Sequence, residues 1–248
     1  MLPKTPSFSL DGKRAFVPGG SRGIGLGCAV ALAEAGADVV IAARSAEQVE
    51  EAASEMRAAG LSASGIALDV TDLEAVAAAC AEPFDILCNS AGLARHASTL
   101  DVTPEDFDAV AGINFRAAFF VAQAVGKGMR PGGSIIQISS QMGHVGGVDR
   151  SVYAATKHAV EGMTKAMAID LGPKGIRVNT ICPTFIRTPL TEQTFSNPER
   201  VAWIEEKIKL GRVGEVEDIM GAVVFLASDA SSLVTGTSIL VDGGWTAG

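Results

Sequence analysis

The sequence predicts a doubly wound α/β fold, in which a mostly parallel sheet of seven strands carries helices on both faces. Short apolar runs alternate with alanine-rich stretches along all 248 residues. Repeated strand–helix–strand order produces parallel sheets with right-handed crossovers. Several of the short runs are apolar at consecutive positions, as in strands that are buried on both faces. No low-complexity linker interrupts the pattern, so we expect residues 1–248 to form a single domain.

Each element follows from local signals. Strands are expected where apolar and β-branched residues cluster between turn-forming residues. Their expected ranges are 14–18, 38–43, 62–68, 84–89, 134–139, 177–182 and 238–241. Helix starts lie between them: Ser45 with Gln48 and Thr71 with Glu74 have capping-box spacing, and Thr103 precedes a proline at an expected first helical position.

Composition and charge exclude several classes of protein. Hydrophobic residues make up 48% of the chain and charged residues 19%, which is enough apolar material for a large core. A formal net charge of −8 and a pI near 4.9 argue against a general surface for nucleic acid or anionic membranes. We expect neither a zinc site nor a disulfide framework, because the four cysteines form no Cys-x-x-Cys pair and no histidines are paired.

The compartment is predicted from what the sequence lacks. The first residues contain no apolar segment typical of a signal peptide. Apolar runs such as DVVIAA and GAVVFLA are too short to cross a bilayer. We therefore expect a cytoplasmic protein with neither a membrane nor a nucleic acid as partner.

A glycine-rich loop follows the first expected strand and opens an alanine-rich helix. Gly19, Gly23 and Gly25 allow the backbone to turn tightly and to approach a diphosphate, whose charge suits a helix N-terminus. A purely structural turn is the alternative, but the strand–glycine–helix order favours nucleotide binding. Other expected contacts in this loop are Ser21, Arg22 and Ile24.

The end of the second expected strand indicates which nucleotide is bound. A site for NAD usually has an acid here for the ribose 2′-hydroxyl. This chain has Ala43 and then Arg44, with Arg22 in the glycine loop. Two guanidinium groups without a carboxylate suit a 2′-phosphate, although two solvated arginines beside a helix are the alternative. We expect NADP(H), with NAD(H) as the second possibility.

Two further strand ends offer candidate cofactor contacts. Asp69 can accept a hydrogen bond from an adenine amino group, or it can cap the helix that begins near Thr71. Asn89 and Gly92 follow the next strand, where a loop would pass the ribose and the nicotinamide. A structural turn explains Gly92 alone equally well. Their neighbours Val70 and Ala91 are also expected contacts.

The only tyrosine of the chain, Tyr153, precedes Lys157 by four residues in the proline-free range 151–172, which we expect to be helical. Residues four apart share a helix face, so the phenol and the ammonium become neighbours. A free phenol titrates near ~10, and a cation within roughly 4–6 Å favours its phenolate. The pair is therefore a candidate general acid/base, although this spacing also occurs by chance in exposed helices.

In combination, these motifs resemble the classical short-chain dehydrogenase/reductase family over essentially the whole chain. The matching segments are Gly19-x-x-x-Gly23-Ile24-Gly25, Asp69, Asn89-Ser90-Ala91-Gly92, Asn114, Ser140, Tyr153-x-x-x-Lys157 and the closing VTGTSILVDGG. The resemblance implies a Rossmann-type fold and hydride transfer between NADP(H) and a small carbonyl or secondary alcohol.

The resemblance also implies roles for individual residues. Tyr153 exchanges a proton with the substrate oxygen, Lys157 stabilises the phenolate and binds the nicotinamide ribose, and Ser140 donates to the same substrate oxygen. Asn114 holds a water that links Lys157 to solvent, with a polar kink in an apolar helix as the alternative. Ser140 is preferred to Ser139 because it lies thirteen residues before Tyr153, which is the usual family spacing. The remaining implied cofactor contacts are Pro183, Thr184, Ile186 and Thr188.

Three positions depart from the family pattern. Pro18 replaces the usual threonine and removes a hydroxyl and a backbone donor from the glycine loop. Ser90 replaces a second asparagine, and Thr184 stands where glycine is commoner. None of these changes removes a catalytic group, so they bear on cofactor affinity and on the shape of the site.

Residues 184–214 are irregular, and we expect them to form a substrate loop or lid, with an ordinary surface connection as the alternative. Cations near the expected mouth favour a polar or anionic substrate such as a sugar acid, whereas the aromatic residues of this segment suit a hydrophobic ketone. The alternative for the cations is that Arg150 pairs across a subunit interface and that the histidines are simply exposed. The cations are Arg95, His96, His144, Arg150 and Arg187. Of these, Arg95, His144 and Arg150, together with Phe185, are the expected substrate contacts.

Other functions remain open at this stage. An NAD-dependent polyol or sugar dehydrogenase and a 3-oxoacyl thioester reductase are the main alternatives, and the acidic surface does not suit an acidic carrier protein as partner. A non-catalytic dinucleotide-binding sensor is disfavoured, because all four catalytic positions are filled. Members of the family are usually tetrameric, so we expect a homotetramer.

Overall fold

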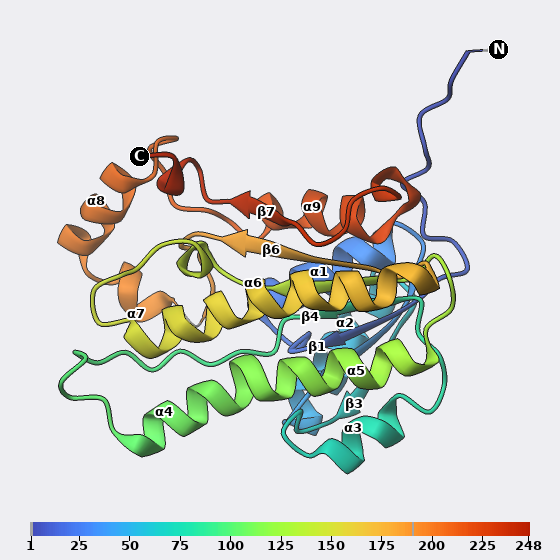
Figure 1. Ribbon diagram of the computed structural model, residues 1–248, viewed down its shortest axis with the longest axis horizontal. Coiled ribbons are helices and arrows are strands. Elements are labelled where there is room, and N and C mark those ends of the chain that lie inside the picture. The colour runs from blue at the N-terminus through green and yellow to red at the C-terminus, as the bar shows by residue number, and fades with distance from the viewer. Residues whose placement is uncertain (1, 190) are drawn as a thin grey trace.

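The computed structural model describes residues 2–189 and 191–248. Seven strands join one sheet in the order β3-β2-β1-β4-β5-β6-β7 (Figure 1). They are β1 (Arg14–Pro18), β2 (Asp38–Ala43), β3 (Ala63–Ala67), β4 (Ile86–Asn89), β5 (Ser134–Ile138), β6 (Arg177–Pro183) and β7 (Ser238–Val241). All of their pairings are parallel, so the expected mostly parallel sheet is wholly parallel in the described ranges. The strand order reverses between β1 and β4, where doubly wound folds form their ligand crevice.

Helices cover both faces of this sheet (Figure 1). One face carries α1 (Gly23–Glu34), α2 (Ala46–Ala58) and α9 (Glu217–Ala227). The other carries α3 (Leu73–Ala79), α4 (Pro104–Ala111), α5 (Ala118–Gly128) and α6 (Ser151–Leu171). A π-helical turn, η1 (Gly112–Ala117), joins α4 to α5. The short 3-10 turns are η2 (Gln141–Gly143), η3 (Gly172–Lys174), η4 (Asp229–Ser231) and η5 (Trp245–Ala247).

Two apolar cores explain why the strands are apolar at consecutive positions. Within β1, Val17 packs with the α1 and α9 side, whereas its neighbour Phe16 packs with α5 and α6 on the other side. In β2, Ile41 and Val40 divide between the two faces in the same way. Burial of each such side chain stabilises the fold by roughly 1.5–3 kcal/mol. Both helical layers are therefore anchored by the same strands.

Two of the three expected helix caps are confirmed. The hydroxyl of Ser45 accepts from the amide three residues later at 3.3 Å, and Thr103 does the same at 3.1 Å ahead of α4. The expectation for Thr71 was wrong. Its hydroxyl donates to Asp69, and Asp72 caps α3 instead by accepting from two first-turn amides at 3.1 Å each. Because Thr71 is engaged by Asp69, the helix begins one residue later.

One apolar segment is longer than the sequence reading allowed for. The continuous helical segment Pro104–Gly128, which includes α4, η1 and α5, has a length and a mean hydropathy of 1.3 that would suffice to cross a membrane. Core helices of globular proteins meet the same criterion. Here Val121 and Val125 of α5 pack into the core under the sheet, so burial against the sheet accounts for the apolar composition.

The irregular segment after β6 folds around a small core of its own. It contains α7 (Glu192–Phe195) and α8 (Pro198–Lys207), which lie beyond the carboxyl end of β6 and close to the C-terminus (Figure 1). Ile204 and Ile208 are buried there against Phe185, Phe195 and Trp245. The segment thus stands beside the crevice end of the sheet without contributing a strand to it.

Candidate active site

An open cavity of about 740 Å³ lies at the carboxyl ends of the strands, where the strand order reverses. Sites for small ligands typically occupy 300–1,000 Å³, so the cavity can hold a cofactor and a small substrate. Its walls come from the loops after β1, β2, β3 and β4, from α6, and from the chain after β6. Of the expected site residues, it is lined by Gly19, Ser21, Arg22, Gly23, Ile24, Gly25, Arg44, Asp69, Val70, Ala91, Gly92, Tyr153, Lys157 and Thr188.

The glycine loop packs too closely for side chains. Gly19 has φ +79°, and a Cβ there would lie 2.7 Å from the backbone of Ser90 and Ala91. A Cβ on Gly25 would lie 2.0 Å from the carbonyl oxygen of Gly19. The helix that follows starts at Arg22 without a side-chain cap, which leaves its first-turn amides for an anion. This cradle fits the diphosphate of a dinucleotide.

The proline that departs from the family pattern does not disturb this loop. The carbonyl oxygen of Pro18 accepts from the amide of Ser90 at 2.9 Å. The next amide, that of Gly19, donates to the carbonyl of Ala42 at 2.7 Å. Both neighbouring strands therefore hold the loop, although Pro18 has no amide of its own.

Two exposed cations line the cavity, one at the N-terminus of α1 and one directly after β2. Arg22 and Arg44 both line it, and within the described residues neither forms an ion pair. The amide and the hydroxyl of Thr71 lower the pKa of Asp69, and the charge of Arg44 lowers it further. Arg44 thus influences Asp69 through space without an ion pair. Free guanidinium groups beside the adenosine end fit a 2′-phosphate.

Asp69 closes the turn before α3 but does not cap that helix. Its Oδ1 accepts from the amide of Thr71 at 2.9 Å and from the hydroxyl at 2.7 Å, which closes the turn before α3. The cap of α3 itself is Asp72. Asp69 also lines the cavity, and its Oδ2 accepts no hydrogen bond from the described chain. That oxygen is the one suited to an adenine amino group, and this contact stays a prediction.

Asn89 lies behind the cavity wall. It is buried, its Nδ2 donates to Gln137 Oε1 at 3.0 Å, and its Oδ1 accepts from the amide of Ala91 at 3.4 Å. Ala91 and Gly92 line the cavity, whereas Asn89 does not. These two hydrogen bonds indicate that Asn89 stabilises the loop after β4.

The phenol and the ammonium meet as the helical spacing predicted. Both residues lie on α6, and Lys157 Nζ is 5.6 Å from the ring centroid of Tyr153. The ammonium also donates to the carbonyl oxygen of Ile138 at 2.9 Å, which fixes it at the end of β5. Both side chains line the cavity. A proton-exchanging phenol with a fixed cation beside it is suited to general acid/base chemistry.

The two neighbouring serines differ in their surroundings. Ser140 is buried, and its Oγ accepts from the amide of Met142 at 3.1 Å, which leaves the hydroxyl proton available for donation. Ser139 lines the cavity, whereas Ser140 is not part of that lining. The Oγ of Ser139 has no hydrogen-bond partner within the described residues. The catalytic assignment of Ser140 stays a prediction.

Asn114 lies in the π-helical turn η1 and is buried. Its Oδ1 accepts from the amide of Leu93 at 2.7 Å, and its Nδ2 donates to the carbonyl of Leu93 at 2.8 Å and to Thr156 Oγ1 at 3.3 Å. The side chain therefore ties the loop after β4 to α6. Single π turns within α-helices occur frequently at functional sites. Whether Asn114 also holds a water stays a prediction.

A buried cation stands next to the phenol on the substrate side. Arg150 is 9% exposed, its guanidinium contacts the ring nitrogen Nε2 of His96, and it lies 5.5 Å from the ring centroid of Phe185. The ring of His96 meets Tyr153 edge-on, with 5.9 Å between centroids. No acid pairs with Arg150 among the described residues. We call Arg150 and Arg200 of α8 the substrate-side cations.

Titration behaviour shows how concentrated this positive charge is. Burial lowers the pKa of Arg150, and the charge of Arg200 lowers it further. Loss of solvent around its ring, with the charges of Arg150 and Arg200, lowers the pKa of His96 to about 4. Asp149 opposes both shifts without cancelling them. His96 is therefore neutral at neutral pH, first because its ring is shielded from solvent and second because Arg150 and Arg200 are positively charged.

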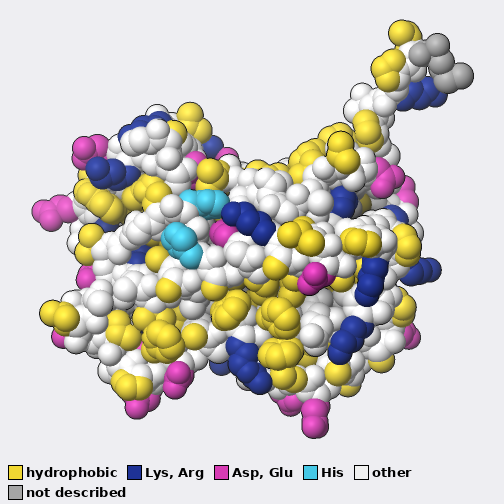
Figure 2. Space-filling model, viewed as in Figure 1, with side chains coloured by type: hydrophobic (Ala, Val, Ile, Leu, Met, Phe, Trp, Pro, Cys, Tyr) yellow, Lys and Arg dark blue, Asp and Glu magenta, His cyan; other side chains and the backbone are white. Residues whose placement is uncertain are grey.

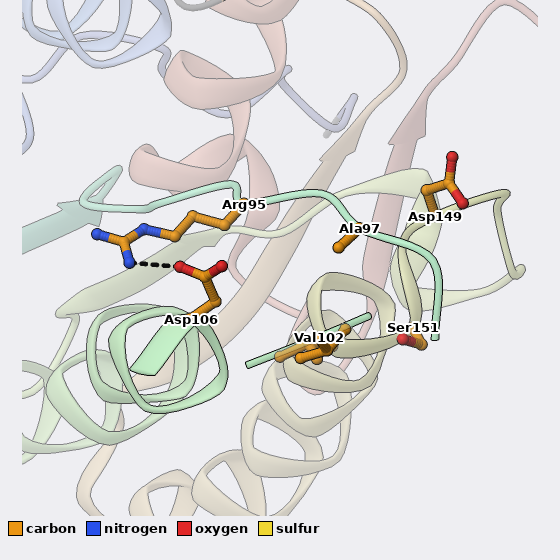
Figure 3. A pocket seen from close by; sticks show the side chains of 7 residues that line it. Arg95, Ala97, Val102, Asp106, Asp149 and Ser151 are labelled. Atoms are coloured by element: carbon orange, nitrogen blue, oxygen red, sulfur yellow. Dashed lines mark hydrogen bonds and ion pairs between the residues drawn. The ribbon is translucent and has the colours of Figure 1, made fainter. Parts of the chain in front are cut away.

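The other expected substrate cations lie elsewhere. Arg95 forms an ion pair with Asp106 at 2.6 Å beside a hollow of only about 10 Å³, outside the cofactor cavity (Figure 3). Arg187 pairs with Glu215 at 3.3 Å. His144 lies 3.4 Å from the sulfur of Cys182. Arg95 and His144 thus both have partners within the described chain, and their expected roles as substrate contacts stay predictions.

The chain after β6 contributes less to the cavity wall than expected. Ile186 is buried in the core against Gly214, and neither Pro183 nor Thr184 is part of the cavity lining. Thr188 does line it. The Oγ1 of Thr184 is buried without a hydrogen-bond partner in the described chain, and the contact of Thr184 with the cofactor stays a prediction.

Several residues of the site were not found from the sequence. Arg200 carried no signal, because an arginine on an amphipathic helix is normally solvated. Most of the others are small or apolar residues that follow recognised motifs and line the cavity through their position in the loops. They are Ala42, Ala43, Ser45, Gln48, Leu68, Ser90, Leu93, Ala94, Ile113, Ile138, Ser139 and Pro189.

Comparison with known proteins gives a consistent result. The family described as enoyl-(acyl carrier protein) reductase matches residues 19–246. Gluconate 5-dehydrogenase of Gluconobacter oxydans (strain 621H) is 42% identical over 96% of each chain. A gluconate 5-dehydrogenase of Burkholderia cenocepacia J2315, solved in complex with NADP and tartrate, superposes with a TM-score of 0.93 at 37% identity, covering 97% of this chain and 98% of that one. A short-chain dehydrogenase/reductase from Serratia marcescens BCRC 10948 has a TM-score of 0.90 at 36% identity, with coverage of 96% and 99%.

Proposed function

Because this chain belongs to the classical short-chain dehydrogenase/reductase family, and so is an oxidoreductase of alcohol and carbonyl groups, we propose that it interconverts a small polyhydroxy acid and its keto acid with NADP(H). The observation that carries the substrate proposal is the buried guanidinium of Arg150, which stands beside Tyr153 without an acid partner in the described chain. A substrate carboxylate is the group that would neutralise it.

The choice of NADP(H) rests on the free cations Arg22 and Arg44 at the adenosine end of the cavity. A guanidinium pairs with a phosphate through two parallel hydrogen bonds, and β2 ends without the acid that would bind a free ribose 2′-hydroxyl. The NADP bound by the gluconate 5-dehydrogenase of Burkholderia cenocepacia supports this choice. NAD(H) is the alternative, and it would make both arginines bystanders.

The catalytic roles follow from the positions around Tyr153. The nicotinamide, when bound, supplies or accepts the hydride. Tyr153 gives its phenolic proton to the carbonyl oxygen during reduction and takes it back during oxidation, while Lys157 stabilises the phenolate. Ser140 donates a hydrogen bond to the same oxygen and polarises the carbonyl. Asn114 holds the loop after β4 against α6, and in this proposal it also keeps the water that serves Lys157.

An acid substrate fits the charge around the phenol. Removing Arg150 from water without a counter-charge is costly, and the positive charges of the substrate-side cations repel one another. A carboxylate bound there offsets both effects at once. The tartrate in the Burkholderia cenocepacia neighbour, and the gluconate of the two relatives' names, are polyhydroxy acids of this kind. A carboxylate at Arg150 would also orient the reacting alcohol toward Tyr153.

A neutral polyol or sugar is the second candidate. An aromatic group next to Arg150 consists of Phe185, Trp203 and Trp245. The ring centroid of Trp245 lies 5.5 Å from that of Phe185 and 5.6 Å from that of Trp203. Aromatic faces bind the carbon face of sugars without regard to their charge. D-erythrulose reductase of Gallus gallus, 38% identical over 97% of this chain and 98% of its own, acts by its name on a neutral sugar.

A paired substrate assay tests the proposal. Gluconate and sorbitol have six carbons each and differ by the carboxylate, so kcat/KM is measured for both with NADP⁺ and with NAD⁺. We expect gluconate with NADP⁺ to give a kcat/KM at least about tenfold above sorbitol, because a carboxylate bound by a buried cation contributes 1.4 kcal/mol or more. Equal or faster turnover of sorbitol would reject the acid substrate, and equal or faster turnover with NAD⁺ would reject the cofactor choice.

We further propose that residues 1–248 act as one domain with a lid at 184–214, in a cytoplasmic homotetramer. Large apolar side chains are exposed on α4, η1 and α6, where Phe107 is 51%, Phe115 41% and Ile169 76% exposed, and apolar surface gathers on this side of the molecule (Figure 2). Contiguous exposed apolar surface is typical of subunit contacts. Light scattering should give four times the chain mass of 25.4 kDa, and the mass of a single chain would reject the assembly.

A further inference from the structure

Three side chains with metal-binding atoms meet outside the cofactor cavity, between η2, α6 and β6. Nε2 of His144 lies 3.4 Å from Sγ of Cys182 and 3.8 Å from Oε2 of Glu161. Sγ of Cys182 lies 3.3 Å from Oε1 of Glu161. One ligand atom from each residue lies within 4.8 Å of the other two. Their sequence separations of 17 and 21 residues match no motif, which is why the sequence indicated no metal site.

We propose that His144, Glu161 and Cys182 form a binding site for Zn²⁺, with water as the fourth ligand. A tetrahedral Zn²⁺ ion has bonds of about 2.3 Å to sulfur and about 2.0–2.2 Å to nitrogen and oxygen, which separates its ligand atoms by roughly 3.3–3.6 Å. With Oε1 of Glu161 as the ligand atom, Sγ of Cys182 lies 3.3 Å from that oxygen and 3.4 Å from Nε2 of His144, and the three atoms lie within 4.8 Å of one another. Side-chain rotation that brings the imidazole and the carboxylate closer together completes the geometry.

The chemistry of the donors selects the ion. A thiolate, an imidazole and a carboxylate suit zinc, whereas Mg²⁺ and Ca²⁺ prefer oxygen donors throughout. A thiolate and a carboxylate also bring two negative charges, which a divalent ion neutralises inside the protein. The thiol of Cys182 donates to Glu161 Oε1 at 3.3 Å. This proton must leave when the thiolate binds the ion, so binding releases one proton to solvent.

Neighbouring hydroxyl groups hold the carboxylate in place. Thr180 Oγ1 donates to Glu161 Oε2 at 2.9 Å, and Ser238 Oγ donates to the same oxygen at 2.5 Å. Such outer hydrogen bonds orient metal ligands and are part of most built metal sites. Glu161 and Cys182 are buried, while the side chain of His144 keeps 31% of its surface exposed. An ion thus enters from the His144 side, where a water completes the coordination.

The position of the site indicates what the ion would do. Glu161 lies one helical turn after Lys157 on α6, and His144 follows η2, which Ser140 caps. A Cβ on Gly143 would lie 3.0 Å from Glu161 Cγ, so η2 and α6 are already in close contact here. An ion that joins η2, α6 and β6 would brace the loop that carries Ser140. It would stabilise the fold without touching the substrate or the cofactor.

Cobalt substitution tests the site directly. The full-length protein is treated with a chelator, reloaded with one equivalent of Co²⁺ or Zn²⁺, and desalted. We expect about one Zn²⁺ per chain by elemental analysis, a thiolate-to-Co²⁺ charge-transfer band in the near ultraviolet, and a higher Tm with Zn²⁺ than without it. Wild-type protein that retains no metal, or that binds Co²⁺ without a thiolate band, would overturn the proposal.

Matched variants assign the ligands. Cys182→Ser should lose the band and at least about 90% of the retained Zn²⁺, whereas Cys80→Ser, a half-buried thiol outside the cluster, should keep both. His144→Asn changes the partly exposed ligand and should weaken Zn²⁺ binding while the circular dichroism spectrum and NADP⁺ affinity stay unchanged. A band that persists in Cys182→Ser or disappears in Cys80→Ser would overturn the assignment. NADP⁺ affinity separates this outcome from any failure of the proposed enzymatic function.

Discussion

Two groups of cations differ in their exposure to water: one lines the cofactor cavity, and the other lies near Tyr153 among residues that do not line it. Arg22 at the N-terminus of α1 and Arg44 directly after β2 are exposed and keep their hydration. Arg150 is buried beside Tyr153, close enough to its neighbours for the pKa of both Arg150 and His96 to fall. Arg22 and Arg44 are solvated, so their charges need no counter-ion in the free protein. The buried charge of Arg150 is unfavourable in the free protein, and a bound anion would offset that free energy.

This difference in exposure indicates how much each group of cations contributes to specificity. An exposed ion pair is typically worth about 0–1 kcal/mol, whereas hydrogen bonds to a buried charge are worth more because no water competes for them. We therefore expect substrate recognition at Arg150 to be more sensitive to substitution than cofactor recognition at Arg22 and Arg44. Tyr153 lies between the two groups and serves the reaction itself. Substitutions at these positions and the pKa of His96 test whether Arg150 is the more sensitive position.

Tyr153→Phe removes the proton donor and keeps the ring. We expect kcat to fall by about 10³-fold, because general acid/base catalysis contributes 10²–10⁴-fold. NADP⁺ affinity, measured by fluorescence titration, should change less than about threefold, since the phosphate cradle and Arg44 are untouched. Activity within tenfold of wild type would contradict the role of Tyr153 as the proton donor.

Arg150→Gln removes the buried charge and keeps a polar side chain of similar length. We expect kcat/KM for gluconate to fall by about 10²-fold and that for sorbitol by less than about fivefold, because only the acid uses the guanidinium. Arg95→Gln is the matched control, since Arg95 is already paired with Asp106 away from the cavity. A similar loss for both substrates would mean that Arg150 supports the fold and not the carboxylate.

Replacement of Arg22 and Arg44 by alanine tests the exposed group. We expect the double variant to lose about 10- to 100-fold in kcat/KM with NADP⁺ and to change little with NAD⁺, because in the proposed complex both guanidinium groups bind the 2′-phosphate, which NAD⁺ lacks. Arg57→Ala, an exposed arginine paired with Glu50 on α2, is the control. If NADP⁺ and NAD⁺ lose equally, the arginines act on the diphosphate or on the fold.

The pKa of His96 reports directly on the buried group. In the free protein it lies at about 4, below the ordinary value of 6.5, because of lost solvent and the charges of Arg150 and Arg200. A bound carboxylate favours the protonated ring, so the pKa should rise by about one unit or more in the complex. Acid binding should therefore tighten as pH falls through the raised pKa of the complex toward the value of about 4 in the free protein. An NMR titration of the three histidines, with and without gluconate, measures the shift, and an unchanged pKa would place the carboxylate elsewhere.

The same contrast separates what the sequence could predict from what it could not. The cofactor end is built from residues close together in the chain: Gly19, Gly23 and Gly25 lie in one loop, and Tyr153 and Lys157 share one helix. Local spacing is enough to place such groups. The double burial of β1 and β2 likewise leaves a visible apolar run. These features were predicted and are present in the structure.

The substrate end depends on contacts between distant segments, and spacing carries no information about them. Arg95 and His96 are adjacent in sequence, yet the first pairs with Asp106 and only the second reaches Arg150. Arg200 enters this group from α8, and nothing local marks it. Thr71 failed as a cap for a related reason, because Asp69 two residues earlier competes for its hydroxyl. Where partners compete, only the folded arrangement decides between them.

The most direct test of the account is a crystal structure of the enzyme with NADP⁺ and a polyhydroxy acid bound. The account predicts the 2′-phosphate against Arg22 and Arg44, the carboxylate against Arg150, and the reacting hydroxyl within hydrogen-bond distance of Tyr153. A 2′-phosphate turned toward solvent would contradict the role of Arg22 and Arg44. A carboxylate bound away from Arg150 would contradict the role of Arg150.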